Sequence, residues 1–388
     1  MILPDYAGGS IANLMRSLGD ACGAAPAPPC PPLRQNVFEP ADTARHVVLL
    51  VIDGLGDNYL RAHGAGGALL RHRAGRLTSV FPSTTATAVT TFLTGLAPQQ
   101  HALTGWHMYF SELDAILAVL PLRPRGGQAL AGQAAALPAR LFGHPSFFQR
   151  IGRPGVCVSP QAIADSPFNR YHAEGAEIRA YRSLAEMFGQ IIDALRMSAR
   201  PAYVHAYYPE LDALAHAHGI GSAQVAACFA ELDAAFAAFL AELSGIGALV
   251  LACADHGFID SPPERQIDLA QHPELQAMLA RPLCGEHRAA YCYLRPGQSE
   301  RFAECVREQL GGRAELRAGA ALVAEGWFGS GAADPRLASR VGDAVLVMRE
   351  NWTLFDWLEG ERRHRMIGVH GGLSADEMLV PLVVARAG

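Results

Sequence analysis

Short runs of apolar, often β-branched residues alternate with long amphipathic segments along this chain, and this alternation limits the possible folds more than any other feature. The run VVLLVI at 47–52 is continuous, which is typical of a strand buried on both faces of a sheet. The segments 181–199 and 222–244 carry apolar residues at helical spacing. The pattern predicts an α/β fold with a doubly wound, largely parallel central sheet and helices on both faces. Further strands are expected at RPGVCVSP, PAYVHAYYPE, IGALVLACADHG and EMLVPLVVARA.

The chain is expected to divide into four regions. Residues 1–44 contain a helical segment and the Pro-rich stretch AAPAPPCPPLRQ, which is typical of an extended arm. Residues 45–284 hold most of the predicted strands and helices and form the α/β core. Residues 285–350 change to a strand, turn, helix, strand pattern, which predicts a small α+β insert bordering the cleft. Residues 351–388 return to the core with a final strand.

Composition excludes several classes of function. The chain has 388 residues, is 50% apolar and carries a formal net charge of −5, so it can bury a large core and offers no broad basic surface for a nucleic-acid polymer. Its 32 basic residues are all arginine. Because there is no lysine, a GxxxxGK[ST] phosphate loop, a Schiff-base lysine and an SxxK acylation pair are all excluded.

Cysteine usage and hydropathy favour an intracellular protein. The eight cysteines form no CxxC pair, so buried free thiols are expected. The N-terminal residues do not resemble a secretion signal, and no apolar run approaches the ~20 residues that span a membrane. We therefore expect a cytoplasmic protein that does not bind membranes, and the sequence leaves its oligomeric state open.

Polar residues follow several predicted strands at their carboxyl ends, where open α/β sheets bind ligands. Each has a simpler explanation when taken alone: a turn aspartate, a chance i,i+4 pair or a surface histidine. Together, three aspartates and three histidines could form two oxygen/nitrogen sites of the kind that zinc or manganese accepts. Two such ions clamp a phosphoryl group in many hydrolases. The candidate ligands are Asp53, Asp212, His216, Asp255, His256 and His370.

The stretch SVFPSTTATAVTTFLTG at 79–95 carries six threonines and two serines. It predicts a helix that follows an extended FPS entry and ends at Gly95. Ser83, Thr84 or Thr85 could cap this helix. A hydroxyl at the same position could instead be a nucleophile, because a helix N-terminus and a divalent ion both favour an alkoxide and a phosphate.

An ordered set of motifs resembles the alkaline phosphatase superfamily, and within it the type I phosphodiesterase / nucleotide pyrophosphatase branch. The resemblance covers about 45–385, and D-x-x-x-H-x-x-G followed by a strand and D-H-G is its most specific part. It implies a hydrolase that acts on a small phosphoester, such as a nucleotide, with two divalent metal ions, zinc or manganese. The motifs are VVLLVIDGLGDNYL, FPSTTATAVTTFLTGLAPQQHAL, YYPELDALAHAHG, ADHG and GVHGG.

The resemblance also implies roles for individual residues. Thr85, ten residues before Gly95, matches the nucleophile that forms a phosphothreonine intermediate, and Thr84 is the second choice. Two ligand sets follow by position. One metal would be held by Asp53, Asp255, His256 and Thr85, and the other by Asp212, His216 and His370.

The sequence departs from the branch near the nucleophile, and this leaves the substrate open. An asparagine expected three residues after the nucleophile is Ala88 here, and an aromatic residue expected next to the nucleophile is Ala86. Tyr207 could stack on a base, and Arg288 or Arg365 could bind an anion. His101, His107 and His205 are possible second-layer or core residues. The alternatives are a phosphomonoesterase, a phosphonate hydrolase, a phosphotransferase or a binding protein that has lost turnover.

Overall fold

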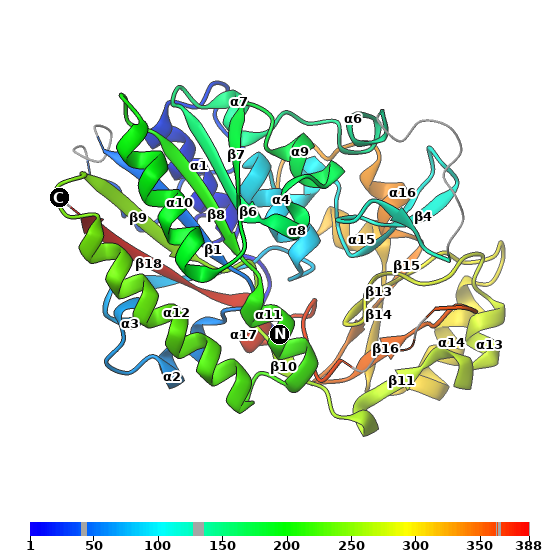
Figure 1. Ribbon diagram of the computed structural model, residues 1–388. Helices are drawn as coiled ribbons and strands as arrows, with labels where there is room; N and C mark the ends of the chain where they lie inside the picture. The colour runs from blue at the N-terminus through cyan, green and yellow to red at the C-terminus, as the bar shows by residue number, and fades with distance from the viewer. Residues whose placement is uncertain (40–44, 127–135, 362, 364–365, 388) are drawn as a thin grey trace.

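The central sheet of the computed structural model has seven strands in the order β2-β18-β9-β1-β8-β6-β7 (Figure 1). The structure describes residues 1–39, 45–126, 136–361, 363 and 366–387. Neighbouring strands from β7 to β9 are parallel, while β18 is antiparallel to both β9 and β2. The expected largely parallel sheet is therefore confirmed. Its strands are β1 (His46–Ile52), β2 (Arg73–Thr78), β6 (Gly155–Pro160), β7 (Ala176–Tyr181), β8 (Tyr203–Tyr208), β9 (Ala248–Cys253) and β18 (Leu379–Ala387).

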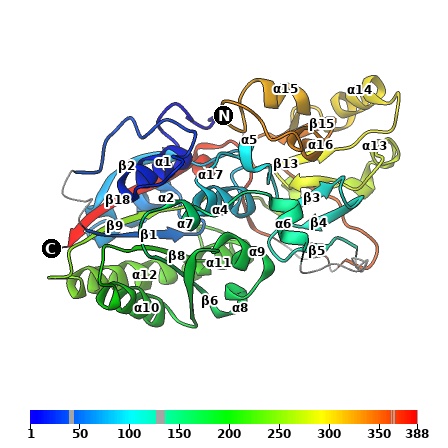
Figure 2. The same ribbon diagram turned by 90° about the horizontal axis from the view of Figure 1, so that it is seen from above.

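Helices cover both faces of this sheet. Figure 2 shows α10 (Leu184–Met197) and α12 (Ala223–Glu242) on one side of it and α1 (Ile11–Cys22) on the other. β1 and β9 are almost completely buried, as continuous apolar runs between two helical layers require. The remaining helices of this half are α2 (Asp57–His63), α3 (Ala68–Arg71), α4 (Thr85–Thr94), α5 (Pro98–His101), α6 (Leu137–Phe142), α7 (Phe147–Arg150), α8 (Gln161–Ala164), α9 (Pro167–His172), α11 (Glu210–His218) and α17 (Ala375–Met378).

A second seven-stranded sheet is antiparallel throughout, in the order β14-β15-β13-β12-β3-β4-β5. Three of its strands come from residues 107–124, so it is not built from the expected 285–350 insert alone. Its strands are β3 (His107–Phe110), β4 (Ala115–Ala118), β5 (Arg123–Pro124), β12 (Cys284–Glu286), β13 (Ala289–Cys292), β14 (Ala314–Ala318) and β15 (Ala344–Met348). The helices nearby in sequence are α13 (Pro273–Ala277), α14 (Ser299–Leu310), α15 (Gly319–Ala324) and α16 (Leu337–Val341).

Two short strand pairs join segments that are distant in sequence. β10 (Ile259–Asp260) pairs with β17 (Gly368–Val369), and this pairing places the residues after β17 beside those after β9. β11 (Gln266–Asp268) pairs with β16 (Thr353–Phe355). All eight cysteines are free and buried, as expected.

Helix α12 is an exception to the expectation that no segment is long and apolar enough to span a membrane. It is the one described helix that is long and apolar enough, by length and composition alone, to cross a membrane. In the structure one face of it packs into the core through residues that include Phe229, Leu232 and Phe236. Asp233 in the middle of the helix accepts hydrogen bonds from the backbone N–H groups of Ala68 and Leu69. The helix therefore forms part of the α/β layer, and its alanine-rich composition accounts for its high hydropathy.

Candidate active site

The carboxyl ends of three neighbouring parallel strands bring the candidate ligands together. Asp53 directly follows β1, Asp255 follows β9, and Asp212 lies in the first turn of α11 after β8. Since β1 pairs with both β8 and β9, these three ends meet at one edge of the sheet. His370 reaches the same place because it follows β17.

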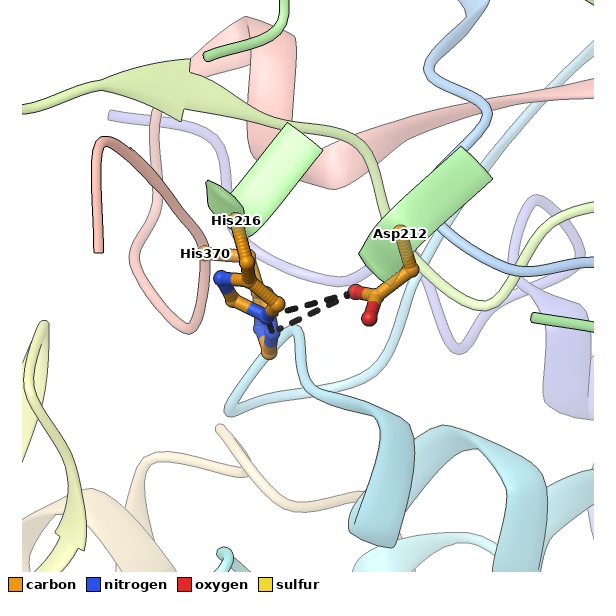
Figure 3. Close-up of side chains that lie close together, drawn as sticks. All are labelled: Asp212, His216 and His370. Carbon is orange, nitrogen blue, oxygen red and sulfur yellow. Dashed lines mark hydrogen bonds and ion pairs between the residues drawn. The ribbon is translucent and has the colours of Figure 1, made fainter. Parts of the chain in front are cut away.

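Three side chains converge in the Asp212 group, which consists of Asp212, His216 and His370 (Figure 3). The Oδ1 atom of Asp212 lies 3.4 Å from His216 Nε2 and 3.8 Å from His370 Nε2. The two Nε2 atoms are 3.2 Å apart. Asp212 and His216 are four residues apart on α11, which places them on the same helix face.

The Asp53 group consists of Asp53, Asp255 and His256 and is fully buried. His256 Nε2 lies 3.3 Å from Asp53 Oδ1 and 3.4 Å from Asp255 Oδ2. The other oxygen of Asp255 accepts hydrogen bonds from the backbone N–H groups of Gly54 and His256, which fix its orientation. The ring of His256 stacks on that of His370, with centroids 3.7 Å apart, so the two groups are in direct contact.

The donor atoms of both groups fit divalent cations. His216 Nδ1 lies 2.9 Å from the Gly368 carbonyl oxygen, and His370 Nδ1 lies 3.2 Å from that of Ser83. Because a carbonyl oxygen only accepts hydrogen bonds, the Nδ1 atom of each histidine carries the proton. The Nε2 atoms of His216 and His370 are therefore unprotonated, and their lone pairs point at each other. Two lone pairs at this distance repel unless a cation lies between them. In addition, three buried carboxylate oxygens have no hydrogen-bond partner: Asp53 Oδ1, Asp212 Oδ1 and Asp255 Oδ2.

Electrostatics at the two groups point to the same deficit of positive charge. Burial, together with the nearby Asp212 and Asp255, raises the pKa of Asp53 well above its usual value. Burial also raises the pKa of Asp212, against the opposing effect of His216 and His256. The pKa of His370 is held well below its usual value by burial and by its two histidine neighbours. Cations at these positions would offset the unfavourable burial of the carboxylate charges, because cations favour ionised carboxylates and neutral imidazoles.

The structure distinguishes the threonines at the start of α4. Thr85 is the first residue of this helix, and its Oγ1 lies 3.1 Å from His256 Nε2 and 3.5 Å from Asp53 Oδ2. Thr84 occupies the N-cap position but does not cap the helix with its side chain. Its hydroxyl donates instead to Glu286 Oε1 at 2.7 Å. Thr85 is therefore the hydroxyl that faces the Asp53 group.

A pocket of about 450 Å³ opens over Thr85 and the Asp212 group and is bordered by the second sheet. Both halves of the molecule thus contribute to one cleft. The lining residues are Thr84, Thr85, Trp106, His107, Arg125, Asp212, His216, Leu283, Cys284, Gly285, Glu286, His287, Ala290, Leu354, Asp356, Trp357, Glu361, Met366 and His370.

Arg288 does not have the substrate-binding role suggested by the sequence. It is 1% exposed, does not line the pocket and forms a buried ion pair with Glu377 at 2.9 Å. It also donates to the backbone carbonyls of Glu350 and Trp352. A guanidinium with all these partners stabilises the core and is not available to an anion. Arg365, the other candidate, lies outside the described residues.

Tyr207 is also placed differently from the expectation. Its hydroxyl donates a hydrogen bond to Asp53, and its ring does not line the pocket. Stacking on a base is therefore not supported, and the side chain orients a carboxylate of the Asp53 group. Ala88 is fully buried in the main hydrophobic core, so the absence of an asparagine there does not alter the pocket wall.

The three remaining histidines lie outside both ligand groups. His101 is buried, with Nε2 3.1 Å from Thr91 Oγ1. His205 is buried in β8, where burial lowers its pKa to about 4. His107 lines the pocket, and burial together with Arg125 and His287 lowers its pKa to about 3.

Sequence reasoning did not single out several residues of the pocket wall. Trp106, Arg125 and Glu286 come from the two segments that form the second sheet, and no motif links these segments. The sequence indicated a role for Glu286 only indirectly, because this residue lies two positions before Arg288 in the region 285–350 that was expected to border the cleft.

Comparison with known proteins agrees with this geometry. The family model for type I phosphodiesterase / nucleotide pyrophosphatase matches residues 47–373. A search of curated protein sequences found no match. Among solved structures, murine ectonucleotide pyrophosphatase / phosphodiesterase 5 is 15% identical, with a TM-score of 0.66 over 89% of this chain and 88% of that one. An inactive threonine-to-alanine variant of that protein in complex with AMP gives the same values.

Phosphonoacetate hydrolase from Sinorhizobium meliloti 1021, in complex with phosphonoformate, is 19% identical. Its TM-score is 0.64 over 89% of this chain and 91% of that one. At these identities the neighbours establish the shared fold, and the family assignment rests on the sequence model. The chain belongs to the type I phosphodiesterase / nucleotide pyrophosphatase family of the alkaline phosphatase superfamily, whose members are metal-dependent hydrolases.

Proposed function

We propose that this protein hydrolyses a phosphodiester through a phosphothreonine intermediate on Thr85, with two divalent metal ions, most simply zinc, held by the Asp53 and Asp212 groups. The observation that carries this proposal is the position of Thr85 Oγ1, 3.1 Å from His256 Nε2 at the buried Asp53 group and at the floor of the pocket. The inactive threonine variant of the murine neighbour is in keeping with a threonine nucleophile.

The residues of this chain position the reactants for two in-line displacements. Bound at these groups, the ions would neutralise charge on the phosphoryl group and lower the pKa of the attacking oxygen. The Thr85 oxygen attacks phosphorus, the alcohol leaves, and water then hydrolyses the phosphothreonine. Because Thr85 begins α4, the positive end of the helix dipole faces the phosphoryl group and favours its negative charge.

The charges of the pocket favour a diester over a monoester. A phosphomonoester carries a second negative charge, which usually requires a further cationic donor. Arg125 is the one arginine among the described lining residues, and Glu361 and Asp356 already engage it. A singly charged diester, such as a nucleotide derivative, therefore suits the described wall better. A phosphonate is the second candidate substrate, because one of the structural neighbours is a phosphonoacetate hydrolase.

The test is a comparison of bis(p-nitrophenyl) phosphate with p-nitrophenyl phosphate, using purified protein whose metal content has been measured. We expect about two metal ions per chain and a higher kcat/KM for the diester. Thr85→Ala should lose at least about 10³-fold in kcat while keeping its metals. Thr90→Ala is the matched control, since among the described residues the Thr90 hydroxyl donates to the Ala86 carbonyl within α4 and to no other group. Full activity in Thr85→Ala would exclude the proposed nucleophile.

A further inference from the structure

One residue of helix α17, Glu377, hydrogen-bonds to the loops that carry the two stacked histidines of the ligand groups. Its carboxylate Oε1 accepts the backbone N–H of Gly372, two residues after His370, at 2.8 Å. Its backbone carbonyl accepts the N–H of Gly257, directly after His256, at 2.8 Å. The rings of these two histidines are in contact. Glu377 therefore holds the backbone beside one ligand of each group.

Four donors saturate the carboxylate of Glu377, which is fully buried. Oε1 accepts from Arg288 Nε at 3.0 Å as well as from Gly372. Oε2 accepts from Arg288 Nη2 at 2.9 Å and from the backbone N–H of Ser374 at 3.3 Å. A bidentate pair of this kind fixes the carboxylate in one orientation. Because Arg288 lies between β12 and β13, the pair also joins the second sheet to the ligand loops.

The backbone after His370 packs directly against this ion pair. A Cβ atom on Gly372 would lie 2.8 Å from Glu377 Oε1 and 2.9 Å from Arg288 Nη2. The Gly372 carbonyl accepts the hydroxyl of Ser83 at 2.7 Å, and the Ser83 carbonyl accepts the Nδ1 proton of His370 at 3.2 Å. The orientation of the His370 imidazole therefore depends on where Glu377 holds Gly372.

The Asp53 group depends on the backbone of α17 and not on the Glu377 side chain. The Met378 carbonyl accepts the N–H of Ser79 at 2.7 Å, and the Ser79 hydroxyl donates to the carbonyl of Asp255. A substitution that changes only the side chain of Glu377 removes none of these contacts. The two ligand groups should therefore respond differently to such a substitution.

We propose that Glu377 is a positioning residue, which orients His370 for metal binding in the Asp212 group. Arg288 holds the carboxylate in place for this role. The inference rests on the proposed two-metal function. Glu377 does not line the pocket, so it acts through the loop that carries His370 and not on the substrate. Without its carboxylate, one of the two ions is held less tightly and the other is not.

The test is Glu377→Gln, with metal binding as the readout. The amide keeps the size of the side chain but offers one acceptor oxygen to four donors. We expect the zinc affinity of the Asp212 group to fall by at least about tenfold, and that of the Asp53 group to change by less than about threefold. Titration of metal-free protein with zinc against a chelating dye measures both affinities. Asp212→Asn and Asp255→Asn assign each affinity to its group.

Glu112→Gln is the matched control for the loss of an acidic partner of a buried arginine. Glu112 pairs with the fully buried Arg340 at 3.0 Å and lies outside the pocket and both ligand groups. This variant should have a lower Tm and unchanged zinc affinities. Equal weakening of both ions in Glu377→Gln, or no weakening of either, would overturn the inference.

A double variant separates positioning from stability and keeps the inference testable if Glu377→Gln does not fold. Replacing both partners of a buried ion pair by apolar side chains is often neutral for stability, so Arg288→Met combined with Glu377→Met should regain most of the Tm. The Gly372 N–H would still lack its acceptor, so the ion of the Asp212 group should remain weakly bound. Normal zinc affinity of both groups in this folded variant would show that Glu377 serves stability alone.

Metal binding also separates this inference from the proposed function. Selective weakening of one ion in Glu377→Gln supports the inference even if the unmodified protein hydrolyses no diester, an outcome that refutes only the proposed function. Zinc affinities that are the same in Glu377→Gln and in the unmodified protein refute the inference and leave the chemistry of Thr85 standing. An unmodified protein that binds fewer than two ions would refute both.

Discussion

Tyr207 shows at the scale of one residue how the second layer of a metal site is built. Its hydroxyl donates to Asp53, so we expect Tyr207→Phe to weaken metal binding at the Asp53 group by about 10- to 100-fold. Competition with a chelating dye measures the affinity. Tyr203→Phe is the control, because its buried hydroxyl has no hydrogen-bond partner among the described residues. Unchanged metal affinity in Tyr207→Phe would show that this hydrogen bond does not orient Asp53.

Arg288 tests whether a buried arginine near the cleft stabilises the fold or binds substrate. Removing one partner of a buried ion pair leaves the other unpaired, so Arg288→Ala should lower the free energy of unfolding by about 3–5 kcal/mol. Urea denaturation measures this change. Arg301→Ala, which removes only exposed pairs, should change it by less than about 1 kcal/mol. A stable Arg288→Ala protein with a raised KM would restore the substrate-binding role.

At the scale of elements, the loops after β1 and β9 and helix α17 pack so closely that only glycine fits. A Cβ atom on Gly257 would lie 2.0 Å from the Asp376 carbonyl oxygen and 2.8 Å from Gly56 Cα. Gly257→Ala must therefore move the loop that carries His256, and we expect a lower Tm together with weaker metal binding. Differential scanning calorimetry with and without added zinc measures both effects. Gly189→Ala on α10, where a Cβ meets nothing within 4 Å, should be neutral or stabilising.

The sequence predicted the elements around the nucleophile more fully than those of the pocket wall. Helix α4 and its end at Gly95 follow from local signals, and the strand ends follow from continuous apolar runs. The structure was needed to choose between hydroxyls, since it shows the Thr84 hydroxyl donating to Glu286 and that of Thr85 facing His256. Because β12 pairs with β3 over a long sequence separation, no local pattern could have placed Glu286 beside Trp106.

At the scale of the whole molecule, buried histidines make stability depend on pH. Burial lowers the pKa of His172 and of His205 to about 4, below the value of 6.5 expected when the chain is unfolded. The unfolded chain therefore binds more protons between these values, and stability that is complete above about pH 6.5 is lost as the pH falls towards 4. We expect Tm to decrease over this window.

His205→Leu should reduce that acid sensitivity, because the imidazole is buried and its Nδ1 has no hydrogen-bond partner among the described residues. The difference in Tm between pH 7 and pH 5 is the measurement. The exposed His218→Gln is the control and should leave the difference unchanged. A His205→Leu protein with an undiminished difference would assign the acid sensitivity to other groups.

The order in which the chain visits its two sheets limits how this enzyme could be divided or recombined. It leaves the central sheet after β2, forms β3–β5, returns for β6–β9, leaves again for β12–β15 and ends in β18. Neither sheet is a contiguous segment, so no single cut would release a fragment that keeps its own strands together. Exchanging the second sheet between relatives would require two separate segments to be replaced together, that is, four crossovers at matched positions. New specificities in this architecture are therefore more accessible through point substitutions in the wall than through recombination.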